Sequence, residues 1–213
     1  MKKRVFMCVS GVLLCGVSVG LFKTAAFGVD PFQTFMSGTA AIVPIPFGVL
    51  YMIVNACLLL FALRAGRSYI GLGTVINLFL LGYVVEFTQY LMGILPFPLM
   101  VPGRLVVLAG AIVLNSLAAA MYFTANLGVS PYDAISLIVT EVWKKGVFKY
   151  NRIISDGVSV MIGLVLCILA GMKAEELPGV IGMGTIITMF FMGPLVQWFR
   201  LHVTDKMLQI KEK

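Results

Sequence analysis

The sequence predicts an all-α membrane protein in which six transmembrane helices form two inverted three-helix repeats. Three observations lead to this fold class. Of the 213 residues, 60% are hydrophobic and only 12% are charged, a charged fraction about half that of an ordinary soluble domain. Apolar stretches of about 20 residues, the length of a bilayer-spanning helix, recur along the chain. Finally, two short motifs of the first half return in the same order in the second half.

The apolar runs define the expected spans and their orientation. With the N-terminus inside, thirteen of the sixteen Lys and Arg residues fall on the cytoplasmic side, and Lys23, Arg104 and Lys173 remain outside. This asymmetry is a positive-inside signal. We therefore expect a multi-pass protein of the plasma membrane, with both termini cytoplasmic and lipid as its main partner, and with no nucleic acid bound. The spans are predicted near residues 5–23, 47–63, 69–93, 104–125, 153–171 and 178–199.

The repeated motifs divide the chain into two copies of one unit. Residues 24–33 (TAAFGVDPFQ) return 100 residues later as TANLGVSPYD, and residues 70–74 (IGLGT) return 111 residues later as IGMGT. Because each unit has an odd number of spans, the second copy should cross the membrane in the opposite direction.

This division predicts a single membrane domain, residues 1–213, with a first repeat at 1–103 and a second at 104–213. The longer offset of the second motif indicates about eleven extra residues in the second copy. We assign them to an enlarged cytoplasmic loop around Glu141–Arg152.

Each copy carries the signature of a helix start after its first span. Asp30 and Ser130 are suitable N-caps, a proline follows each, and a polar residue, Gln33 or Asp133, stands at the third helical position. The apolar segments that follow are too short to span a bilayer, so each is expected to be a re-entrant or an interfacial helix. If these helices are re-entrant, both helix starts approach a substrate site. If they are interfacial, Asp30 and Ser130 only cap them. The structural positions of these motifs are Gly28, Pro31, Gly128, Pro131, Gly73 and Gly184.

Polar residues within the spans supply further candidates, because an ionisable group in hydrocarbon is costly and seldom kept without a role. Glu86 in the third span could load and release a coupling ion, or it could be a structural group between helices. Asn55, Asn115 and Asp156 are expected mainly to join helices. The candidates for substrate or ion binding are Asp30, Gln33, Glu86, Ser130, Asp133 and Asn77.

The chain resembles the YczE/YitT-like family of bacterial multi-pass membrane proteins. The resemblance is carried by residues 125–133 (ANLGVSPYD) and 182–185 (GMGT), with weaker copies in the first half. Longer members of that family carry a soluble C-terminal domain, so this chain is similar to the short, membrane-only branch. The resemblance implies a fold and a membrane location, but no settled activity.

The inverted repeat predicts a small-molecule secondary transporter or exporter, whose two units rock against each other around a central site. Two alternatives stay open: a substrate-binding subunit that is energised by a partner protein, and a membrane scaffold or regulator, for instance a homodimer. The sequence has no nucleophile–base pair, phosphate loop or metal-ligand spacing, so neither an enzyme nor a cofactor or metal is expected.

Overall fold

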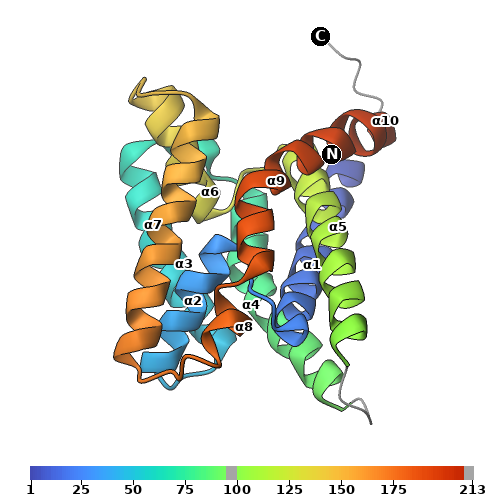
Figure 1. Cartoon of the computed structure of the whole chain (residues 1–213). Coiled ribbons are helices and arrows are strands. Elements are labelled where there is room, and N and C mark those ends of the chain that lie inside the picture. Colours follow the sequence, from blue (N-terminus) through green and yellow to red (C-terminus); the bar gives the residue numbers. More distant parts are fainter. Residues whose placement is uncertain (95–99, 209–213) are drawn as a thin grey trace.

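The computed structural model describes residues 1–94 and 100–208, and its regular elements in these ranges are all helices (Figure 1). Two irregular turns of π-helix, η2 (Ile138–Val142) and η3 (Arg200–Thr204), extend α6 and α9, and η1 (Arg67–Tyr69) is a 3₁₀ turn. The α-helices are α1 (Lys2–Ala25), α2 (Pro31–Ile42), α3 (Phe47–Ala65), α4 (Leu72–Gly93), α5 (Val101–Ala125), α6 (Pro131–Leu137), α7 (Phe148–Leu169), α8 (Leu177–Val180), α9 (Met183–Phe199) and α10 (Asp205–Met207).

Six helical segments are long and apolar enough to cross a membrane, which confirms the predicted number of spans. They are α1, α3, α4 and α5, residues 150–169 of α7, and the stretch 177–207, which comprises α8, α9, η3 and α10. The last segment is longer than predicted because η3 and α10 continue α9 beyond Phe199. The N-terminus and α10 lie at the same end of the molecule (Figure 1).

The helices gather in two bundles, and each bundle takes helices from both halves of the chain. One bundle contains α1, α4, α5 and α9, in which α1 makes its most extensive contacts with α5 and α4. The other contains α2, α3, α6 and α7, on the left in Figure 1, where α2 packs on α7 and α3 on α6. The two halves of the sequence therefore interlock instead of forming separate three-helix bodies.

The loop lengths correct one prediction. Residues 43–46 join α2 to α3, and the corresponding segment before α7, residues 143–147, is only slightly longer. Most of the extra residues of the second half instead lie after α7, in the segment 170–182 that contains α8, and the others lengthen α7 and the loop before it. The assignment to Glu141–Arg152 was wrong because α3 and α7 share too little sequence to set their alignment.

Small and polar residues set the central crossing of α1 and α5. A Cβ atom at Gly11 would lie only 2.9 Å from the carbonyl oxygen of Ala118, so these two backbones approach very closely. Ser18 Oγ donates a hydrogen bond of 3.0 Å to Asn115 Oδ1 across the same crossing. The prediction that Asn115 joins helices is confirmed.

Candidate functional site

The two short helices begin as predicted. Asp30 accepts a hydrogen bond of 3.2 Å from the backbone N–H of Gln33, and Ser130 Oγ accepts one of 3.1 Å from the N–H of Asp133. A proline occupies the start of each helix. These caps satisfy backbone donors that the helices leave without an internal partner.

The starts of α2 and α6 meet inside the molecule. The rings of Phe32 and Tyr132, the second residues of the two helices, stack with their centroids 4.6 Å apart and their planes at 22°. The ring of Tyr51 from α3 also packs on Phe32, edge-on with the centroids 6.1 Å apart. The two helix starts therefore share one aromatic contact. We call Phe32, Tyr132 and Tyr51, together with the polar residues next to them, the central site.

A charged network adjoins this contact on α6 and α7. The guanidinium of Arg152 forms ion pairs with the carboxylates of Asp133 and Asp156, the second at 3.2 Å. Tyr132 donates its hydroxyl to Asp156 Oδ1 at 2.6 Å, and Ser159 donates to the Tyr132 oxygen at 3.1 Å. The guanidinium also lies 4.8 Å from the centroid of the Tyr132 ring. Each carboxylate thus has the same cation as its partner, and a charge in a low-dielectric interior is costly without one.

Sequence reasoning missed the role of Arg152, which it placed in a cytoplasmic loop. The side chain is 29% exposed, whereas that of Asp156 is 7% exposed, so the ion pair points into the protein. The spacing of four residues between Arg152 and Asp156 is a helical ion-pair signal that could have revealed their relation. Asp156 does join two helices as predicted, through Tyr132.

On the side of the central site that the first half contributes, some buried polar atoms lack a hydrogen-bond partner among the described residues. Gln33 is 3% exposed, and within the described part of the chain its Oε1 atom has no hydrogen-bond partner. The same holds for Oδ1 of Asn55 on α3. Tyr51 donates its hydroxyl to Asn77 Oδ1 on α4 at 2.9 Å. A buried acceptor without a donor is costly, so a donor from water or a ligand would find a favourable place here.

Five of the six predicted binding residues are therefore connected through the aromatic contact, and Glu86 is the exception. Its carboxylate lies against Gly48 of α3, where an added Cβ atom would meet Oε2 at 3.0 Å. At 1.5 Å per residue, Glu86 is roughly 13 Å from Asn77 along α4. The connected residues are Asp30, Gln33, Ser130, Asp133 and Asn77.

The predicted glycines hold each short helix against the last long helix of the other half. Gly184 N–H donates to Phe27 O at 2.7 Å, and Gly73 N–H donates to Leu127 O at the same distance. Gly28 and Gly128, with φ of 95° and 105°, allow this approach because both angles lie in a region that side chains rarely adopt. Two equivalent backbone contacts result, which we call the backbone crossings, and each joins residues of different halves of the chain.

The hydroxyl of Tyr132 should contribute measurably to stability. In the Tyr132→Phe variant, Asp156 loses a short hydrogen bond and Ser159 loses its acceptor, so we expect a loss of about 1–2 kcal/mol. The thermal unfolding temperature of the purified protein in detergent measures this loss. Tyr90→Phe is the control because Tyr90 is 67% exposed. Equal shifts for the two variants would contradict the assigned bond.

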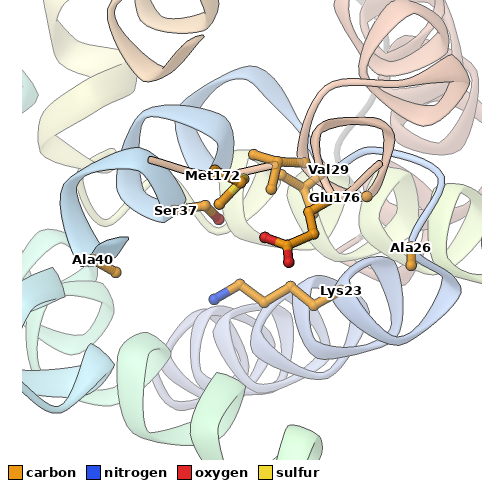
Figure 2. A pocket seen from close by; sticks show the side chains of 9 residues that line it. Lys23, Ala26, Val29, Ser37, Ala40, Met172 and Glu176 are labelled. Atoms are coloured by element: carbon orange, nitrogen blue, oxygen red, sulfur yellow. The ribbon is translucent and has the colours of Figure 1, made fainter. Parts of the chain in front are cut away.

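A pocket of about 310 Å³ lies beside α2, lined by Ser37 and Ala40 of that helix and by Val29 before it. Its walls come from the end of α1, from α2 and from the segment between α7 and α9 (Figure 2). Among the described residues, no three His, Cys, Asp or Glu side chains are placed to hold a metal ion. The residues that line the pocket are Lys23, Ala26, Val29, Ser37, Ala40, Met172, Glu176, Gly179 and Val180.

Residues 2–201 match a family that is described as a family of unknown function, DUF6198. The chain belongs to this family. The uncharacterized membrane protein YczE of Bacillus subtilis (strain 168) is 26% identical over 187 residues, which cover 88% of this chain and 80% of YczE. An uncharacterized protein of Haemophilus influenzae is 22% identical over 197 residues, which cover 92% of this chain and 83% of that protein. No solved structure matches significantly.

The membership confirms the resemblance to YczE that the two motifs indicated. Together with the six candidate spans, it establishes a multi-pass helical membrane protein of a family whose function is not known. The relatives carry no stated activity, so a function must be argued from the central site itself.

Proposed function

We propose that this protein is a secondary transporter or exporter of a small molecule, with its substrate at the central site. The observation that carries the proposal is the charged network of Arg152, Asp133 and Asp156 beside the contact of Phe32 and Tyr132. Buried charges in a membrane protein are expensive and typically mark a substrate or ion pathway. Gln33 and Asn55 add acceptors that a bound solute would satisfy.

The inverted repeat and the re-entrant form of α2 and α6 are part of this proposal. Equivalent residues of the two halves meet in pairs: Phe32 with Tyr132 in the stack, and Cys15 with Asn115 in a hydrogen bond of 3.3 Å. The two backbone crossings at Gly28 and Gly128 also correspond. An approximate two-fold axis in the membrane plane would relate such pairs, and transporters built this way bind at the repeat interface.

The proposed motion differs from a rocking of the two sequence halves. Because the halves interlock, we take the two bundles as the moving units, α1, α4, α5 and α9 on one side and α2, α3, α6 and α7 on the other, with the packing of α3 on α4 as the contact that changes between them. Movement between the bundles would open the central site first to one side of the membrane and then to the other.

The orientation follows from the charge distribution. We place both termini in the cytoplasm and the segment 170–182 outside, so that most basic residues stay inside. Glu86 is retained as a candidate coupling group outside the central site. If it carries the coupling ion, Glu86→Gln will abolish coupled flux while leaving the protein folded, and unchanged flux will exclude this role.

Two-sided access to positions 30 and 130 tests the proposed function. In a variant without the four native cysteines, we expect Asp30→Cys to react with a membrane-impermeant thiol reagent from outside and Ser130→Cys from inside. Ser68→Cys and Lys173→Cys, on exposed connecting segments, mark the two sides. The measurement is the labelled fraction in right-side-out and inside-out vesicles.

Either of two results would overturn transport. If positions 30 and 130 react from the same side, the two helix starts do not face a common alternating cavity. If neither position reacts while Ser68→Cys and Lys173→Cys do, the central site is closed to solvent from both sides of the membrane. A scaffold, or a binding subunit that needs an energised partner, would then be the better account.

A further inference from the structure

The pocket at the end of α1 carries two opposite charges on facing walls. Figure 2 shows the amine of Lys23 on α1 and the carboxylate of Glu176 on the opposite segment, both directed into the same space. Among the described residues, ion pairs are formed by Arg152 alone, so no salt bridge joins Lys23 to Glu176. Each charge is therefore available to a ligand that enters between them.

An aromatic ring holds the amine of Lys23 in place, and the carboxylates of Asp30 and Glu86 act on its charge from nearby, although neither forms an ion pair with it among the described residues. Its Nζ atom lies 3.4 Å from the centroid of the Phe47 ring, which is a cation–π contact. Such a contact holds the amine in a defined position yet leaves its N–H donors free for an anionic group. Glu176 stands on the exposed segment 170–182, just before α8.

Between the two charges, the pocket is mainly apolar. Val29, Met172 and Val180 contribute apolar side chains, and Ser37 adds one hydroxyl. Its volume of about 310 Å³ is at the lower end of the range for small-molecule sites, which is roughly 300–1,000 Å³. The pocket thus suits a compact ligand with an apolar body, a negative end for Lys23 and a positive end for Glu176.

We propose that this pocket binds a small zwitterion with an apolar side chain, that is, a molecule of amino-acid type. A simple anion would leave Glu176 unpaired, and a simple cation would leave Lys23 unpaired, whereas a zwitterion satisfies both charges at once. Val29 lines the pocket and directly precedes Asp30 at the central site. The pocket is an entry site for the substrate, a role that rests on the proposed transport function, although binding itself does not.

Binding to the purified protein tests this inference without any measurement of flux. The probes are L-leucine, 3-methylbutylamine, which lacks the carboxylate, and 4-methylpentanoate, which lacks the amine. We expect isothermal titration calorimetry to give leucine at least about 10-fold tighter binding than either analogue, because each lost charge-assisted contact is worth about 1.5–3 kcal/mol. Equal affinities for the three probes would overturn the inference.

Two variants with matched controls locate the binding. Glu176→Gln should weaken the binding of leucine about 10-fold or more and leave the affinity for 4-methylpentanoate unchanged. Glu175→Gln lies on the same exposed segment but outside the pocket, so it should change neither affinity. Lys23→Gln should weaken the binding of leucine by a similar factor, and Lys173→Gln should leave it unchanged. Glu176 is exposed, so its replacement leaves folding intact even if Lys23→Gln does not fold.

The results also separate this inference from the proposed function. Leucine binding that depends on Glu176, combined with one-sided labelling at positions 30 and 130, would support the pocket and contradict transport. Two-sided labelling with no preference for leucine over its analogues would support transport and overturn the zwitterion site. An equal loss of leucine affinity in Glu175→Gln and Glu176→Gln would also overturn it.

Discussion

Arg152→Leu is expected to destabilise the protein by about 3 kcal/mol or more, the largest effect of any single side-chain replacement at the central site. Breaking a buried ion pair by removing one partner typically costs about 3–5 kcal/mol, because the remaining charge is left without compensation, and the lower end applies here since the Arg152 side chain is 29% exposed. Here the substitution leaves two carboxylates, Asp133 and Asp156, without their shared cation. The measurement is the thermal unfolding temperature and the monodisperse yield of purified protein in detergent.

Arg67→Leu is the matched control. Arg67 is exposed, and its guanidinium donates to the carbonyl oxygen of Leu63 at the end of α3, so its loss should cost at most a few tenths of a kcal/mol. Adding Asp156→Asn to Arg152→Leu should recover part of the loss, since one fewer carboxylate then needs a counter-ion. Equal behaviour of Arg152→Leu and Arg67→Leu would show that the network does not stabilise the fold.

Gly28→Ala is expected to be comparably severe, with a loss of at least about 3 kcal/mol. An L residue at φ of 95° is strained by about 1–3 kcal/mol, and the new Cβ atom would lie 2.4 Å from the backbone nitrogen of Gly182. Backbone cannot move aside as a flexible side chain can, so the crossing with α9 would open. Unfolding temperature and monodisperse yield again provide the measurement.

Gly128→Ala should give a similar loss, because its Cβ atom would meet the backbone nitrogen of Gly71 at 2.5 Å. Gly110→Ala is the control: nothing lies within 4 Å of its Cβ position in α5, and alanine should stabilise that helix by about 0.5–1 kcal/mol. If Gly28→Ala proved as stable as Gly110→Ala, the crossings would not be needed for the fold.

Two sequence predictions were wrong for physical reasons. Arg152 was placed in a loop, because a basic residue near the start of a span ordinarily reports topology. The extra residues of the second half were placed before α7 instead of after it, because α3 and α7 are both apolar and align equally well in several registers.

The six spans and the two capped short helices could be derived from the amino-acid order alone. A run of apolar residues and a cap such as Asp30 act through neighbours in the chain, so local chemistry is enough to predict them. Which helices become neighbours required the tertiary structure. In lipid, apolar helix faces do not by themselves select a partner, and the choice depends on close packing and on polar contacts between distant residues. The stack of Phe32 on Tyr132, the pairing of Asp133 with Arg152 and the interlocking of the two halves are of this kind.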